Sequence, residues 1–121
     1  MTRCPPGWHT VTPRLVATDA AGLAAFVTRV FEARDETRPG APIVLFVGDS
    51  PLMISEAGVR DARPAFLYVY AVDADAAYLR ALEAGARSLE EPWDTPYGDR
   101  RCMVADPWGN TWQIATMKGD G

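Results

Sequence analysis

Hydrophobic and polar residues follow the same order in two successive blocks of the chain. In the first block, residues 11–17 are rich in β-branched side chains and roughly alternate, which predicts a strand. Two short apolar runs, 43–47 and 52–55, flank Gly48 and Asp49, a typical hairpin sequence. Between them we expect an amphipathic helix that begins after Asp19 as N-cap and has one apolar stripe: Leu23, Phe26, Val27, Val30 and Phe31.

The second block repeats this pattern. Residues 66–72 have strong strand composition. Asp73 or Asp75 would cap a helix with an apolar stripe, and Gly85 suits the left-handed turn at its end. That stripe consists of Ala76, Leu79, Leu82 and Ala86. We then expect a short strand at 88–90, a loop at 92–97, strands at 100–105 and 111–117, and a turn at 106–110.

An offset of 54 residues superposes residues 17–20 on residues 71–74, so the chain contains an internal repeat. The 121 residues predict a single domain, 1–121, of two modules at about 10–58 and 64–117, joined by a polar loop. One module alone would leave a sheet face uncovered. We therefore expect paired modules whose sheets curl around a cavity, with the helices outside. Pairing within one chain and exchange across a dimer are both open.

Composition excludes several classes of partner. The net charge is −4, so no basic surface for nucleic acid or an anionic membrane is expected. No apolar run approaches the length of a membrane helix, and the first residues lack a secretory pattern. These features predict a cytoplasmic protein. Cys4 and Cys102 are expected to be reduced thiols.

The run from Thr95 to Thr116, with Asp-Pro-Trp-Gly-Asn at 106–110, resembles the C-terminal signature of the vicinal-oxygen-chelate superfamily. This superfamily includes glyoxalase I, bleomycin-resistance proteins and extradiol dioxygenases. Residues 12–15 and 66–70 are similar to its two module openings, and the resemblance extends from about residue 10 to 117. It implies an α+β fold of two tandem βαβββ modules that form a curved mixed sheet around a cavity.

The resemblance also implies four positions where related enzymes hold a metal ion. Here they are occupied by Thr12, Met53, Phe66 and Gln113: a hydroxyl, a thioether, a ring and an amide. Divalent ions prefer imidazole, thiolate or carboxylate ligands. We therefore expect no metal and no other cofactor; a divalent metal held by unusual ligands is the alternative. His9 lies an odd step from Thr12 and is expected at the surface.

Aromatic side chains provide the other candidate site. Phe66, Tyr68 and Tyr70 share one face of their strand, and the resemblance favours directing them into the cavity. There they would suit a flat ligand, whereas the alternative is that they fill a core. On the predicted loop, Trp93 and Tyr97 suit either a pocket rim or a homodimer interface.

Two polar residues complete the candidate site. Gln113, on the cavity face of the last strand, would need a ligand, backbone or water partner. Of Arg100 and Arg101, which point to opposite faces, only one enters the cavity; we prefer Arg101 as the partner of an anionic ligand group. No nucleophile–base pair or dinucleotide fingerprint is evident.

These features predict a homodimer that binds a small, aromatic molecule without metal, for example to sequester an antibiotic or toxic metabolite. The alternative is an enzyme, a lyase or isomerase that acts on a small metabolite with Tyr68, Tyr70 or Arg101 as its polar groups. A third possibility is an accessory domain whose pocket is filled by aromatic rings.

Overall fold

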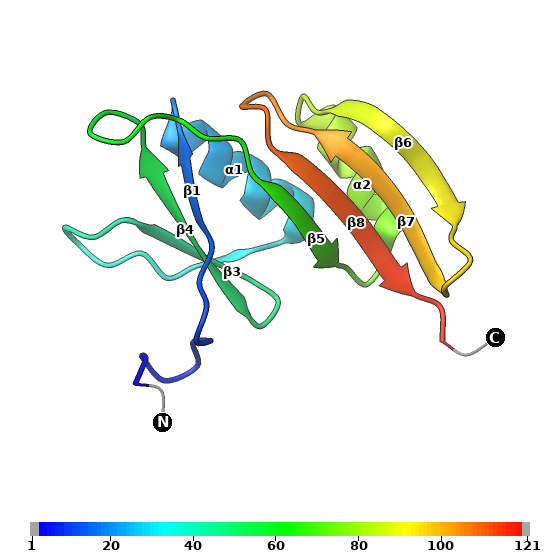
Figure 1. Ribbon diagram of the computed structural model, residues 1–121, viewed down its shortest axis with the longest axis horizontal. Helices are drawn as coiled ribbons and strands as arrows, with labels where there is room; N and C mark the ends of the chain where they lie inside the picture. Colours follow the sequence, from blue (N-terminus) through cyan, green and yellow to red (C-terminus); the bar gives the residue numbers. More distant parts are fainter. Residues whose placement is uncertain (1–2, 120–121) are drawn as a thin grey trace. The chain divides into compact units, whose positions relative to one another are not determined.

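The computed structural model describes residues 3–119. The chain divides into two compact units, one ending at Arg63 and the other beginning at Pro64. Each unit contains one helix and one four-stranded mixed sheet (Figure 1). The predicted α+β fold of two βαβββ modules is therefore confirmed. Among the described residues, no helix has the length and apolar character needed to cross a membrane.

The first module has the strand order β1-β4-β3-β2. The two strands β1 and β4 are parallel, and the other neighbours are antiparallel. The Gly48 turn joins β3 to β4, as its sequence predicts, with a left-handed φ of 58°. The elements are β1 (Arg14–Ala17), α1 (Ala20–Phe31), β2 (Arg34–Asp35), β3 (Ile43–Val47) and β4 (Ser50–Glu56).

The second module repeats this topology with the strand order β5-β8-β7-β6. Here β5 and β8 are parallel, whereas β7 is antiparallel to both of its neighbours. Helix α2 packs on β6, β7 and β8, and so covers one face of the sheet (Figure 1). The elements are β5 (Phe66–Tyr70), α2 (Ala74–Glu83), β6 (Arg87–Asp94), β7 (Asp99–Ala105) and β8 (Thr111–Met117).

Helix α1 buries the face that its sequence predicts, apart from Phe31, which is half-buried. Its N-terminus is capped twice. The side chain of Asp19 accepts a hydrogen bond from the amide of Gly22, and the carboxylate of Glu56 at the end of β4 accepts two more, from the amides of Asp19 and Ala20. These acceptors satisfy amides that have no partner within the helix.

Helix α2 buries a different face from the one its sequence suggests. Leu79, in the predicted apolar stripe, is 58% exposed, and the sheet is instead covered by Tyr78 and three alanines: Ala74, Ala77 and Ala81. The small alanine side chains bring the helix close to the strands. The ring of Tyr78 can be buried against the sheet because its hydroxyl bonds to Ser88 at 2.8 Å, and this bond offsets the free-energy cost of burying a polar group.

Strand β6 is longer than the predicted strand at 88–90. It continues through Pro92 and Trp93, which the sequence assigned to a loop. Two register shifts against β7, between Ser88 and Glu90 and between Glu90 and Trp93, interrupt the regular pairing. A proline, which has no amide hydrogen to donate, is compatible with a strand at such an irregularity. Tyr97 remains in the loop between β6 and β7.

Two other strand boundaries differ from prediction. Strand β1 begins at Arg14 rather than at residue 11, and the carbonyl of Pro13 accepts a hydrogen bond from Met53 just before it. The two-residue strand β2 follows the first helix in a stretch for which no strand was predicted. Both cysteines are free thiols, with Cys4 exposed and Cys102 buried, as expected. Burial raises the pKa of Cys102 to about 11.

The turn between β7 and β8 is organised by Asp106, which is buried. Its carboxylate accepts four hydrogen bonds, from the amides of Trp108 and Asn110, the side-chain amide of Asn110 and the indole of Trp112. Gly109 takes a φ of 87°, which favours glycine. The Asp-Pro-Trp-Gly-Asn sequence therefore fixes the turn and one side of the core beneath α2.

Candidate ligand-binding face of the second sheet

The face of the second sheet opposite α2 carries aromatic and charged side chains; we call it the aromatic face. Strand pairing sets it out in rows, because residues paired across a sheet point to the same side. One row joins Tyr70, Ala115, Arg101 and Trp93. The next row joins Tyr68, Gln113, Met103 and Glu90.

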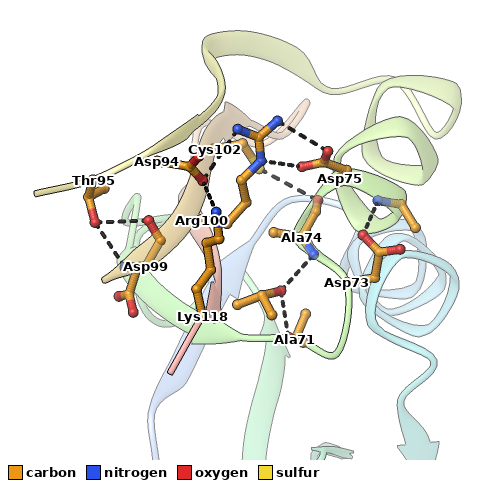
Figure 2. A network of polar contacts seen from close by, with 12 residues as sticks. Ala71, Asp73, Ala74, Asp75, Asp94, Thr95, Asp99, Arg100, Cys102 and Lys118 are labelled. Atoms are coloured by element: carbon orange, nitrogen blue, oxygen red, sulfur yellow. Dashed lines mark hydrogen bonds and ion pairs between the residues drawn. The ribbon is translucent and has the colours of Figure 1, made fainter. Parts of the chain in front are cut away.

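Asp99 lies at the centre of the polar contacts on this face. It is only 5% exposed, and its Oδ2 accepts hydrogen bonds from the hydroxyls of Tyr68 at 2.6 Å and Tyr70 at 3.0 Å. The two rings have centroids 5.4 Å apart. Thr95 holds the backbone of Asp99 through three hydrogen bonds, two of which involve the threonine hydroxyl (Figure 2). The carboxylate is therefore fixed at its backbone and at one oxygen.

The two phenols are held in the protonated form. Burial, together with the hydrogen bond and negative charge of Asp99, raises the pKa of Tyr68 far above its ordinary value. The hydrogen bond to Asp99 is the largest cause of the raised pKa of Tyr70. Asp99 raises both pKa values for the same reason, since a phenolate beside a carboxylate is disfavoured. At neutral pH both tyrosines are therefore donors to Asp99.

A second cluster surrounds Arg101. Its guanidinium bonds to Glu90 in a bidentate manner, at 3.1 and 3.3 Å, and also donates to the hydroxyl of Tyr97. Its Cζ lies 5.6 Å from the ring centroid of Trp93 and 5.9 Å from that of Tyr97. Burial opposes ionisation of Glu90, but hydrogen bonds from Arg101 and Trp93 outweigh it and lower the pKa of Glu90.

Arg100 points to the helix side of the sheet, so of the two arginines it is Arg101 that lies on the aromatic face. Its guanidinium bonds to Asp75 at the start of α2, at 3.1 and 3.2 Å, and lies 3.5 Å from Asp94. Lys118 also pairs with Asp94, at 3.1 Å. Figure 2 shows this cluster, and the side-chain carboxylate of Asp99 is directed away from it.

The structure brings most of the predicted site residues together in the second module. Seven of them share the aromatic face or its rim: Phe66, Tyr68, Tyr70, Trp93, Tyr97, Arg101 and Gln113. Phe66 begins β5, is 65% exposed and pairs with Thr111. Thr12 and Met53 belong to the first module, where Thr12 precedes β1 and Met53 lies on β4.

Two residues of the aromatic face escaped sequence analysis. Asp99 lies at the entry to the predicted strand at 100–105 and was not proposed as a site residue, although its two-residue spacing from Arg101 places both on one face. Glu90 ends the predicted short strand at 88–90, and the register shifts that bring it opposite Met103 carry no clear sequence signal. Both are the acceptors that hold the predicted donors in place.

The side chains at the superfamily's metal positions do not fit a divalent cation. In the strand registers Met53 pairs with Arg14 and Gln113 pairs with Tyr68. Arg14 and Tyr68 each lie two residues after the expected positions Thr12 and Phe66. Arg14 adds a cation that bonds to Ser55, and the proton of Tyr68 is committed to Asp99. No group of three histidine, cysteine or carboxylate residues suited to a metal occurs within residues 3–119.

His9 lies at the surface, as expected, with its Nε2 3.8 Å from Asp49.

Known proteins with similar sequences identify the family of this chain. The sequence profile of the Glyoxalase/Bleomycin resistance protein/Dioxygenase superfamily matches residues 7–114. The chain belongs to this superfamily. This match confirms the resemblance that was inferred from the Asp-Pro-Trp-Gly-Asn turn and the two module openings.

Three similar proteins illustrate the range of this superfamily. The anthracycline biosynthesis protein DnrV of Streptomyces peucetius is 38% identical over 78 residues, which cover 62% of this chain but only 28% of DnrV. TioX from Micromonospora sp. ML1 has the same fold, with a TM-score of 0.75 and 23% identity over 88% of this chain and 97% of TioX. TnmS3, an antibiotic binding protein from Streptomyces sp. CB03234, has a TM-score of 0.71 and 19% identity over 88% of this chain and 93% of TnmS3.

Proposed function

We propose that this superfamily member binds a small aromatic organic molecule on the aromatic face, without a metal ion. The observation that carries the proposal is the exposure of aromatic rings on an otherwise ordered sheet face: Tyr68 is 38% exposed and Tyr70 61%. Large apolar side chains gathered at a surface mark binding sites. Their hydroxyls and the neighbouring Arg101 supply the few polar contacts that orient a ligand.

The names of similar proteins support a small organic ligand. TnmS3 is an antibiotic binding protein of this fold, and DnrV is an anthracycline biosynthesis protein. Sequestration of such a compound is the physiological role that we propose. The donor set at the superfamily's metal positions favours recognition by ring contact over coordination. Assembly as a homodimer and a cytoplasmic location stay predictions.

Titration with planar aromatic compounds, followed by amide NMR shifts and thermal unfolding, tests the proposal. Saturable shifts should centre on β5 and β7, and a ligand at 100 times its Kd should stabilise the fold by about 2.7 kcal/mol. Tyr70→Ala should weaken binding, whereas Leu79→Ala, an exposed apolar residue on α2, should not. Equal affinities for the two variants, or no saturable shift on this face, would contradict the proposal.

An enzymatic role as a lyase or isomerase is the second candidate. It is favoured by the 2.6 Å contact between the Tyr68 hydroxyl and Asp99, which is the geometry of an acid–base pair. However, the raised pKa of Tyr68 makes it a weak acid at neutral pH, which favours binding alone. Mass spectrometry of a bound compound after incubation separates the two: recovery unchanged supports binding, and conversion supports catalysis.

A further inference from the structure

The cluster formed by Tyr68, Tyr70 and Asp99 presents acceptors rather than donors, and we call it the tyrosine–aspartate cluster. An ionised carboxylate only accepts hydrogen bonds, so each phenol donates its single hydrogen to Oδ2 of Asp99. The Tyr68 oxygen is also within hydrogen-bond reach of the Arg101 guanidinium, so one of its lone pairs remains, whereas both lone pairs of the Tyr70 oxygen remain. A ligand that meets these oxygens must therefore bring its own hydrogen-bond donor.

Among the described residues, the charge of Asp99 is not paired with a cation, although the Arg101 guanidinium lies within hydrogen-bond reach of the Tyr68 hydroxyl. Within residues 3–119 no ion pair involves Asp99, because the surrounding cations are paired elsewhere: Arg101 with Glu90, Arg100 with Asp75 and Lys118 with Asp94. Taking a carboxylate out of water without a counter-charge is unfavourable. The two phenols spread this charge toward the aromatic face but do not neutralise it. A cation placed against the phenol oxygens would.

The rings add a third preference in the same direction. Tyr68 and Tyr70 are tilted by 57° to each other, with both rings partly exposed. The face of a tyrosine ring attracts ammonium groups through its quadrupole. A cation between or above these two rings would meet two ring faces, two phenol oxygens and the charge of Asp99 behind them.

We propose that the tyrosine–aspartate cluster selects aromatic compounds that carry a protonated amine. This inference rests on the proposed function and names the ligand class. The ammonium group donates to the phenol oxygens and balances Asp99, while the aromatic part contacts the rest of the aromatic face. Acceptor-only groups, such as a ketone, meet no free donor in the cluster, and a carboxylate is repelled by Asp99. Among nearby groups only Arg101 favours an anion, and Glu90 already neutralises it.

Three matched naphthalene probes test this selection: 1-naphthylmethylammonium, its N-acetyl derivative and 1-naphthylacetate. Calorimetry at pH 7 and low salt should show the ammonium compound binding about tenfold tighter than the neutral one, and the carboxylate weakest. The preference should shrink as salt is added. Asp99→Asn should remove most of it. Asp75→Asn, which removes a carboxylate on the helix side, is the matched control and should keep it.

The outcomes separate this inference from the proposed function. Equal affinities for all three naphthalenes on this face overturn the amine selection and leave aromatic binding intact. A preference for naphthylacetate also overturns it and points to Arg101. No saturable shift from any probe contradicts both. If Asp99→Asn does not fold, Tyr70→Phe serves instead: it removes one acceptor from an exposed side chain, so the ammonium preference must fall while the neutral probe binds as before.

Discussion

The hydroxyl of Tyr68 and the carboxylate of Asp99 are 2.6 Å apart, although β5 and β7, which carry them, are not neighbours in the sheet. The contact passes over β8, where Gln113 and Ala115 lie on the same face. It therefore ties the edge strand β5 to the interior of the second sheet through side chains as well as through backbone pairing.

We predict that Tyr68→Phe destabilises the protein more than Tyr70→Phe does. Loss of the Tyr68 hydroxyl leaves the buried Asp99 carboxylate short of its closer donor, which should cost about 1–3 kcal/mol. The Tyr70 bond is longer, at 3.0 Å, and that side chain is more exposed. Urea unfolding of the two variants measures the difference. Equal stabilities would mean that the two hydroxyls support Asp99 equally.

Glu56 should make stability depend on pH in the acid range. Hydrogen bonds from the amide of Ala20, and next from that of Asp19, lower the pKa of Glu56 in the folded state. A depressed folded pKa contributes stability above the unfolded pKa of about 4.3, and this contribution is lost as pH falls through the folded value. Glu56→Gln should flatten that part of the stability–pH curve.

Melting temperatures of the wild type and of Glu56→Gln between pH 2 and 6 check this prediction. Asp61→Asn is the matched control, since Asp61 is an exposed carboxylate in the loop before Arg63. The control should keep the acid dependence of the wild type. A flattened curve in the control, or an unchanged one in Glu56→Gln, would assign the effect to other carboxylates.

Asp106→Asn should be strongly destabilising without involving the aromatic face. One carboxylate holds four donors from the turn and from Trp112, and replacing one oxygen by an amino group sets a donor against donors. We expect a loss of about 2–4 kcal/mol, typical of a broken buried network. Denaturant unfolding gives the value, and the fluorescence of Trp112 reports the local change. A loss below 1 kcal/mol would contradict this role.

Protein purified without chelator and then dialysed should contain no stoichiometric zinc, nickel, manganese or iron. The reason is the chemistry of each module taken by itself: Met53 offers a thioether beside the guanidinium of Arg14, and Gln113 an amide beside a phenol already bonded to Asp99. Inductively coupled plasma mass spectrometry gives the metal content. One equivalent retained after dialysis would overturn the metal-independent proposal, and substitution of Gln113 would then show whether its amide is a ligand.

Periodicity predicted the fold well where apolar residues were large. The stripe of α1 is made of Leu23, Phe26, Val27 and Val30, and it is the buried one. In α2 the same periodicity selected Leu79 and missed Tyr78. Tyrosine is a partly polar residue, and the bond of its hydroxyl to Ser88, which allows its burial, is a tertiary contact. Alanines, which carry little hydrophobic signal, make up the rest of that face.

Sequence patterns predicted the rings and Arg101 of the aromatic face, but not its carboxylates Asp99 and Glu90. Alternation along β5 placed Tyr68 and Tyr70 on one face, and the turn motif placed Gln113 beside them. Two features could not be predicted from the sequence. One is the contact between side chains of strands that are not adjacent, as between Tyr68 and Asp99. The other is the irregular register of β6, which brings Glu90 to Arg101. Both depend on tertiary pairing rather than on local pattern.

The offset of 54 residues maps Arg14 of the first sheet onto Tyr68 of the second, and the two modules surround these positions with unlike chemistry. In a duplicated scaffold of this kind, the residues that determine the fold are distinct from those that give each sheet face its own chemistry. Selection can retain one topology in both copies while the side chains on each copy diverge independently. For engineering, residues such as Tyr70 and Trp93 offer a surface for altered specificity, and the buried turn at Asp106 should be left untouched.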